Sequence, residues 1–261
     1  MQGPPASDSL QAGLLDGLAR LAGLAPSEVL LGRLRRAALL LAGMTEARLP
    51  PPDPEDPFWA ALLDAVTVQE TRLFRAASQL EALAGLVFPG LRALSRPLRL
   101  LSAGCATGEE GWTLAALAGE AGFAADVTGI DLCRPALARA ATGRFPPGPP
   151  DPLRDVPPAY WRHFPRLPDG GARAAPPEGV TVSWSRQNLC ELGVPEESFD
   201  IILCRNVLIY LTEPARAVVV GGLCARLAPG GALLLGATDA PPPALGLALW
   251  SAAQPSLWRR A

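Results

Sequence analysis

One segment of the chain is the most informative about its fold: Leu98-Arg99-Leu100-Leu101-Ser102-Ala103-Gly104-Cys105-Ala106-Thr107-Gly108-Glu109-Glu110. It begins as a short apolar run, which is typical of a buried β-strand, and continues as a loop of small residues that opens a helix. Gly104 and Gly108 let the backbone approach a ligand closely, and the start of the helix presents free N–H groups. We therefore predict a strand, a loop and a helix in succession, with a ligand site at the loop.

The same kind of pattern continues from this segment toward the C-terminus. Short apolar runs alternate with helical patterns, which indicates an α/β domain with a parallel sheet covered by helices on both faces. The expected strands are residues 98–103, 125–130, 180–185, 199–204 and 232–236, and the expected helices are residues 109–121, 135–141 and 213–227. Residues 145–179 contain eleven prolines, too many for a central strand or a long helix, so we expect an insertion there.

The part of the chain that precedes this domain has a different pattern. From Leu10 to about Leu94 apolar residues recur at spacings of three and four, which favours short amphipathic helices. Prolines between residues 50 and 57 interrupt the pattern, and it resumes over residues 58–66 and 70–86. We therefore expect a small N-terminal helical domain over residues 1–75, which includes the start of a linker helix, and an α/β domain over residues 76–261.

Composition excludes several classes of function. The net charge of -2 gives no basic excess for nucleic-acid binding. The five cysteines are never closer together than 14 residues, so no metal site is expected, and they are typical of reduced, buried thiols in a cytoplasmic protein. A Ser-His or Cys-His mechanism would need the single histidine, His163, which lies in the proline-rich insertion. All 23 basic residues are arginine, which excludes lysine-based Schiff-base or P-loop chemistry.

Membrane insertion is also not expected. Residues 1–10 lack the basic flank and apolar core of a signal peptide, and the most apolar later stretches contain Arg216 and Arg226. The oligomeric state cannot be read from the sequence, and a monomer is the default expectation.

Asp131 makes the loop a candidate nucleoside site. It ends the second expected strand, 23 residues after Gly108, where a carboxylate can accept hydrogen bonds from both hydroxyls of a ribose. A dinucleotide site has a third glycine where this chain has Glu109 and Glu110, and two carboxylates would repel a pyrophosphate. They suit the cationic amino end of S-adenosylmethionine, so this cofactor is favoured over NAD. The glutamates also stabilise the positive end of the helix, and that simpler role stays open.

Five segments of the chain, including the loop around Gly104, resemble the CheR family of chemotaxis receptor glutamate methyltransferases, over roughly residues 10–260. The loop around Gly104 is similar to the family's nucleotide-binding loop, and Leu227-Ala228-Pro229-Gly230-Gly231 is similar to the turn before its fifth strand. The other matching segments are Thr67-Val68-Gln69-Glu70-Thr71-Arg72-Leu73-Phe74-Arg75, Gln187-Asn188-Leu189 and Cys204-Arg205-Asn206-Val207-Leu208-Ile209-Tyr210-Leu211. The resemblance implies a class I (Rossmann-like) methyltransferase sheet flanked by helices, closed by residues 257–260.

The resemblance also implies roles for individual residues. Arg75 and Tyr210 would lie at the reacting methyl group, Asp131 at the ribose, and Arg205 and Asn206 at the methionine side. The full set implied or inferred to bind the cofactor is Gln69, Thr71, Arg75, Gly104, Gly108, Glu109, Glu110, Asp131, Asn188, Leu189, Arg205 and Asn206. Simpler roles remain for some of them: Thr71 as a helix cap, the Tyr210 ring as core packing and Arg205 as a surface ion-pair partner.

The implied activity is the formation of glutamate methyl esters on the cytoplasmic helices of a chemoreceptor-like protein. Arg33, Arg35 and Arg36 lie on one expected helix and would bind such an acidic substrate, although arginine clusters are usually solvated surface. Departures from the family pattern include Gln69 in place of asparagine, Leu73 in place of phenylalanine and Asp239 near a usual glutamate. They leave two alternatives open: a methyltransferase of the same fold with another substrate, and a catalytically weak regulatory protein that binds the cofactor.

Overall fold

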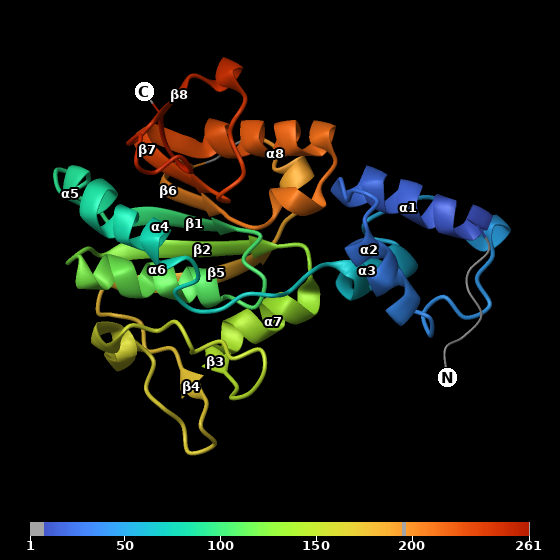
Figure 1. Cartoon of the computed structure of the whole chain (residues 1–261), viewed down its shortest axis with the longest axis horizontal. Helices are drawn as coiled ribbons and strands as arrows, with labels where there is room; N and C mark the ends of the chain where they lie inside the picture. Colours follow the sequence, from blue (N-terminus) through green and yellow to red (C-terminus); the bar gives the residue numbers. More distant parts are fainter. Residues whose placement is uncertain (1–7, 195–196, 261) are drawn as a thin grey trace.

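A computed structural model describes residues 8–194 and 197–260 of the chain, so the expectation about a signal peptide falls partly on residues outside the description. Three helices, α1 (Asp8–Ala22), α2 (Glu28–Arg36) and α3 (Pro57–Val66), form a group at one end of the molecule (Figure 1). The remainder is a sheet with helices on both faces. Within the described ranges, no helix is long and apolar enough to cross a membrane.

The sheet has the order β5-β2-β1-β6-β7-β9-β8. Five strands are mutually parallel: β1 (Leu98–Ala103), β2 (Ala125–Asp131), β5 (Val180–Arg186), β6 (Phe199–Cys204) and β7 (Leu227–Leu235). β9 (Leu257–Arg260) runs antiparallel to β7, and β8 (Leu247–Leu249) follows at the edge. The expected class I methyltransferase sheet is confirmed, including its closure by residues 257–260.

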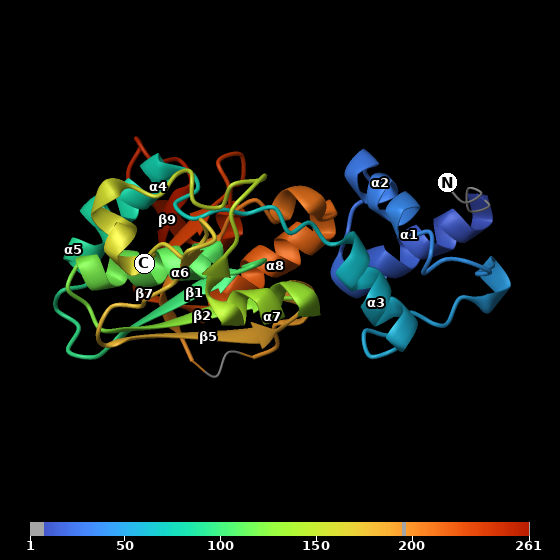
Figure 2. The ribbon, with the colours of Figure 1, turned by 90° about the horizontal axis from the view of Figure 1, so that it is seen from below.

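Two hydrophobic cores explain why the central strands are continuously apolar. On β1, Leu98 and Leu100 pack with residues of α6 (Glu109–Glu120), whereas Leu101 and Ala103 pack with α8 (Glu213–Arg226). Successive side chains of a strand point to opposite faces, so a sheet covered on both sides needs apolar residues throughout. α4 (Ala77–Ala82) also packs on the α6 face, and Trp112 of α6 donates its indole N–H to Ala140 of α7 (Arg134–Thr142). Figure 2 shows the sheet nearly edge-on.

The linker between the two parts is not the helix that the sequence pattern predicted. Residues 67–76 are irregular, and the helix begins only at Ala77, continuing through a π-helical turn (Leu83–Val87) into α5 (Phe88–Gly90). Leu73 and Phe74 are buried in the core beneath the sheet, at 0% and 3% exposure. Phe74 and Ala76 have φ of 55° and 59°, which an α-helix does not permit. Tertiary packing therefore overrides the local apolar period over residues 70–76, and the expected helix is found only from Ala77 onward.

The proline-rich insertion keeps a minimal antiparallel sheet. β3 (Arg144–Phe145) pairs with β4 (Ala172–Arg173), and a 3₁₀ turn (Pro158–His163) lies between them. Phe145 and Phe164 are buried on the α6 face of the large sheet. The expected insertion therefore contains two short paired strands, and buried aromatic residues anchor the rest of it.

Candidate functional site

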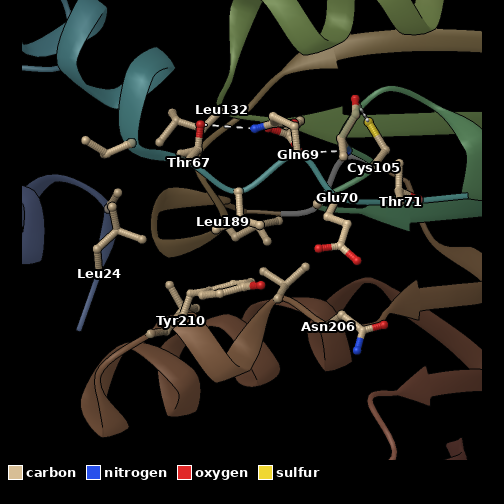
Figure 3. A pocket seen from close by; sticks show the side chains of 18 of the residues that line it. Leu24, Thr67, Gln69, Glu70, Thr71, Cys105, Leu132, Leu189, Asn206 and Tyr210 are labelled. Carbon is tan, nitrogen blue, oxygen red and sulfur yellow. Dashed lines mark hydrogen bonds between the residues drawn. The ribbon is translucent and has the colours of Figure 1, made fainter. Parts of the chain in front are cut away.

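One pocket lies at the carboxyl ends of the parallel strands, between the sheet and the N-terminal helices (Figure 3). β1 is the point at which the chain order reverses, since β2 lies on one side of it and β6 on the other. Open parallel sheets bind ligands at such a crevice. The pocket is lined by residues 22–30 in part, by residues 66–71 with Arg75, by the loop after β1, by the ends of β2 and β5, and by residues 205–211 in part.

The loop after β1 requires its glycines. Gly104 has φ of +76°, and a Cβ atom there would lie 2.4 Å from Val207. Gly108 has φ of +94°, and a Cβ atom there would lie 2.7 Å from the Cβ of Ala140. At both positions the left-handed backbone disfavours a side chain, and a neighbouring atom leaves no room for one. Gly104 lines the pocket, whereas Gly108 starts α6 outside it.

Asp131 lies at the pocket end of β2 and is 9% exposed. Its Oδ2 accepts the N–H of Ala106 at 2.8 Å, and its Oδ1 accepts the N–H of Cys133 at 2.9 Å. Burial raises the pKa of this carboxyl, and the backbone donors partly oppose that rise. Each carboxylate oxygen keeps a second lone-pair site. Asp131 can therefore hold the loop in place and still accept hydrogen bonds from a ribose.

The two glutamates at the start of α6 separate in the structure. Glu110 lines the pocket, where its Oε1 accepts the hydroxyl of Ser102 and its Oε2 accepts the Nε of Arg205, both at 2.7 Å. Glu109 is outside the pocket lining, 5% exposed, and accepts the hydroxyl of Thr107. Burial raises the pKa of Glu109. Of the two glutamates that the sequence left equivalent, Glu110 is the one that lines the pocket.

Arg205 extends this network toward the linker. Its Nη1 donates to the carbonyl oxygen of Arg75 at 2.6 Å and to Oε1 of Gln79 at 3.3 Å. Gln79 in turn donates to the hydroxyl of Ser256 at 2.7 Å. The side chain of Arg205 is 4% exposed, so it is not a surface ion-pair partner. Gln79 and Ser256 lie outside the pocket lining and hold Arg205 in place, and the sequence analysis did not identify them. The sequence gives no signal for Gln79, because α4 also contains Ser78 and Glu81.

The end of the pocket beyond Asp131 combines apolar walls with one free acceptor. Leu24, Leu132 and Leu189 line it (Figure 3). The side chain of Asn188 has a protein partner at each end, because its Oδ1 accepts the N–H of Cys190 and its Nδ2 donates to the carbonyl oxygen of Leu21 at 2.6 Å. These two bonds fix its orientation, and each group keeps one further hydrogen-bonding position.

Gln69 presents the free acceptor of this region. Its Nε2 donates to the hydroxyl of Thr67 at 3.0 Å, whereas its Oε1 is buried without a hydrogen-bond partner in the described part of the chain. A buried acceptor of this kind is costly unless a ligand or water satisfies it. The longer glutamine thus still offers the site a hydrogen-bonding group.

Tyr210 and Arg75 both line the pocket. Tyr210 ends a 3₁₀ turn (Leu208–Tyr210), and its carbonyl oxygen accepts the N–H of Ala25 at 2.8 Å, so the segment after α1 holds this turn in place. The Nη1 of Arg75 donates to the carbonyl oxygen of Glu70 at 3.0 Å. Asn206, with φ of 59°, also lines the pocket (Figure 3). Thr71 also lines the pocket, and because α4 starts at Ala77 it is not a helix cap.

The three arginines of α2 lie in different surroundings and outside the pocket lining. Arg33 is half-buried, and its Nη1 donates to the carbonyl oxygen of Thr67 at 2.8 Å. Arg35 and Arg36 are exposed. Arg33 therefore turns toward the linker, and the binding of an acidic substrate by these arginines stays a prediction, with Arg35 and Arg36 the exposed members.

The charged residues that line the pocket can be compared with the charges of S-adenosylmethionine and of a dinucleotide. Its charged lining consists of the carboxylates of Glu70, Glu110 and Asp131 and the guanidinium groups of Arg75 and Arg205, which leaves one net negative charge. A pyrophosphate carries two negative charges and would be repelled. S-adenosylmethionine carries one net positive charge, with two cationic groups and one carboxylate. The lining therefore fits S-adenosylmethionine and not a dinucleotide.

Comparisons with known proteins agree with this geometry. The family described as "CheR methyltransferase, SAM binding domain" matches residues 69–244. The chain is 31% identical over 207 residues to the "Probable biofilm formation methyltransferase WspC" of Pseudomonas aeruginosa, a match that covers 71% of this chain and 47% of that protein. It is 31% identical over 195 residues to "Chemotaxis protein methyltransferase 1" of Vibrio cholerae, covering 69% of this chain and 67% of that protein. The chain thus spans about half the length of the first relative and two thirds of the second.

Proposed function

Because the chain belongs to the CheR methyltransferase family and contains its S-adenosylmethionine-binding domain, we propose that it methylates glutamate side chains of a chemoreceptor-like helical protein. The observation that carries the proposal is that Arg75 and Tyr210 line the same pocket as Asp131 and Glu110. A cofactor held by Asp131 and Glu110 would have its reactive end next to a positive group and a hydroxyl, which suit an incoming carboxylate.

The pocket residues divide between the parts of the cofactor. Asp131 accepts the ribose hydroxyls, and Glu110 faces the amino end together with Arg205 and Asn206. Leu132, Leu189 and Asn188 surround the adenine, and Gln69 offers it the free Oε1. Thr71 and Gly104 complete the wall on the methionine side. Gly108 and Glu109 act indirectly, because they shape and support the start of α6 outside the lining.

The chemistry needs little from the protein beyond alignment. When bound, S-adenosylmethionine supplies a methyl group on a positively charged sulfur. A glutamate carboxylate, with an ordinary pKa of about 4.3, is already ionised at neutral pH, so no general base is required. Arg75 and Tyr210 orient that carboxylate, an effect of proximity and alignment. The guanidinium of Arg75 is partly occupied by the carbonyl oxygen of Glu70, which limits its pairing with the acceptor and suits a positioning role.

The substrate side of the proposal rests on α2. Its residues Val29 and Leu30 line the pocket, and Arg35 and Arg36 are exposed on the same helix. An acidic receptor helix that meets these arginines would bring its glutamates close to the pocket. The reaction is placed in the cytoplasm, where free thiols such as the five of this chain stay reduced, and the chain is proposed to act there as a monomer.

Two alternatives to this proposal are a methyltransferase with another substrate and a regulatory protein without catalysis. The relatives include a biofilm-formation and a chemotaxis methyltransferase at the same identity, so similarity does not select the receptor. A regulatory protein without catalysis has no need for Arg75 and Tyr210 at the pocket, and their presence supports an enzyme.

The test is transfer of a tritiated methyl group from S-adenosylmethionine to a receptor cytoplasmic fragment. Glutamate methyl esters release their label as volatile methanol in alkali, whereas N-methyl groups do not. Alkali-labile label that disappears when the acceptor glutamates are replaced by glutamine is the expected result. Alkali-stable label would indicate another substrate class. Binding of S-adenosylhomocysteine without any transfer would indicate the regulatory alternative.

A further inference from the structure

The linker residues that line the pocket have little support of their own. Within the described part of the chain, residues 68–71 make no hydrogen bond from backbone to backbone. The segment after them is firmly attached to the sheet domain. Leu73 donates its N–H to the carbonyl oxygen of Pro152 at 3.0 Å, and Phe74 donates its N–H to the hydroxyl of Thr113 at 3.1 Å. The carbonyl oxygen of Arg75 accepts from Arg205. The pocket-lining residues thus depend on what holds the linker at its other end.

That other end is held from α2. The Nη1 of Arg33 donates to the carbonyl oxygen of Thr67 at 2.8 Å, across 34 positions of sequence. The hydroxyl of Thr67 donates to the carbonyl oxygen of Leu63 at 2.9 Å and accepts the Nε2 of Gln69, whose Oε1 faces the pocket region without a partner. One continuous set of contacts therefore runs from Arg33 through Thr67 to Gln69.

The surroundings of Arg33 differ from those of a solvated arginine. Its Nε is buried and has no hydrogen-bond partner among the described residues, an arrangement that costs free energy. Arg35 and Arg36, on the same helix, are exposed, with Arg35 4.0 Å from Glu28 and the Nε of Arg36 donating to the carbonyl oxygen of Gly32. An apolar residue at position 33 would remove the unpaired buried donor but would also lose the hydrogen bond to Thr67, so the retained arginine serves that bond.

We propose that Arg33 is a positioning residue for the cofactor site: it fixes the first linker residue so that Gln69 and Thr71 are presented to the ligand in advance. The inference rests on the proposed occupation of the pocket by S-adenosylmethionine. A linker held at both ends loses less conformational freedom when the ligand binds, so affinity rises without any contact between Arg33 and the ligand. The three arginines of α2 then have two tasks, since Arg35 and Arg36 remain free to meet the protein substrate.

The test compares Arg33→Met with the matched control Arg36→Met. S-adenosylhomocysteine is titrated calorimetrically into the full chain, because its zero net charge removes the long-range effect of losing a cation. Arg33→Met should raise the dissociation constant for S-adenosylhomocysteine about tenfold. A tenfold change corresponds to about 1.4 kcal/mol, which is less than the full strength of a hydrogen bond to a charged group, because only part of that strength is felt at the ligand. Arg36→Met should leave it within about twofold. Arg33→Lys, which retains one donor for Thr67, should recover most of the affinity.

Two further readouts separate positioning from a general structural role. The urea midpoint of Arg33→Met should not fall, because the change also removes the unpaired buried Nε. In the methyl-transfer assay Arg33→Met should raise KM for S-adenosylmethionine, whereas Arg36→Met should raise KM for the receptor fragment.

Equal affinity of Arg33→Met and the parent for S-adenosylhomocysteine would overturn the inference, and so would a loss of affinity that merely follows a fall in the urea midpoint. A parent chain that does not bind S-adenosylhomocysteine at all would instead overturn the proposed function, so the two failures are distinguishable.

Discussion

The buried pair of Glu110 and Arg205 offers the sharpest test of the site's construction. The side chains are 11% and 4% exposed, and Arg205 makes three hydrogen bonds, one to Glu110 and two to acceptors of the linker and α4. Arg205→Met removes all three and leaves a carboxylate in a buried position with only the Ser102 hydroxyl. Breaking a buried pair from one side typically costs about 3–5 kcal/mol. For a chain of this size the thermal midpoint should fall by roughly 6–20 °C.

The double variant Arg205→Met with Glu110→Gln shows how much of the lost stability comes from the unpaired charge of Glu110. It removes the unpaired charge, and glutamine can still accept the Ser102 hydroxyl, so only the carbonyl oxygen of Arg75 and Oε1 of Gln79 remain without their donor. At about 1 kcal/mol for each lost hydrogen bond, the double variant should lie about 2 kcal/mol below the parent. The second substitution should therefore restore about 1–3 kcal/mol of the stability that Arg205→Met alone loses.

Urea unfolding of the ligand-free chain, followed by circular dichroism at pH 7, measures these differences. The slopes of the transitions need to agree among the variants, so that the midpoints report stability. A double variant that is less stable than Arg205→Met would refute the reasoning, because it would mean that Glu110 contributes stability without its cationic partner.

Three further predictions concern the ligand and the pH. Asp131→Ala should weaken S-adenosylhomocysteine binding by about 1–3 kcal/mol in calorimetry, because the ribose hydroxyls lose a charged acceptor; preferential binding of NAD by the parent would contradict the assignment. Tyr210→Phe should lower methyl transfer with little change in cofactor affinity, whereas Arg75→Ala should lower both, and equal losses in the two variants would contradict these roles. Burial raises the pKa of Glu109 above 4.5 in the folded chain, so the native state binds its proton more tightly and the parent loses stability as the pH rises through this range. Glu109→Gln removes that loss, and its urea midpoint relative to the parent should therefore be higher at pH 7 than at pH 5.

The sheet was predictable because its signals are local and redundant. All five expected strands and the helices that follow β1, β2 and the 3₁₀ turn at residue 208 were found within a few residues of their expected bounds, apart from the earlier start of β7 at Leu227. Each apolar run is bounded by a turn, and those of β1, β6 and β7 are buried on two faces. The linker failed for the opposite reason. Leu73 and Phe74 fit a helical period, but they are buried beside α6 and the insertion, which a sequence window does not contain.

The glutamate pair shows a limit of a different kind. Consecutive residues of a helix point about 100° apart, so at most one of Glu109 and Glu110 can face a given ligand. The sequence supplies both carboxylates but not the rotation of α6 about its axis. That rotation is set by packing, including the contact of Gly108 with Ala140 and the hydrogen bond from Phe74 to Thr113. The choice between the two glutamates is therefore a property of the folded core.

The contribution of the N-terminal helices to the site could hardly be predicted from the sequence. They meet the sheet domain partly through backbone atoms, since Ala25 donates to the carbonyl oxygen of Tyr210 and Thr212 donates to that of Gly23. Side chains add the ion pair between Asp64 of α3 and Arg134 of α7. Every residue type carries backbone atoms, so no motif marks the backbone contacts. The bond from Arg33 to Thr67 is of the same kind on its acceptor side. A substitution in α2 that spares every pocket residue can therefore alter the site, because the pocket is complete only where the helical part is attached to the strand ends.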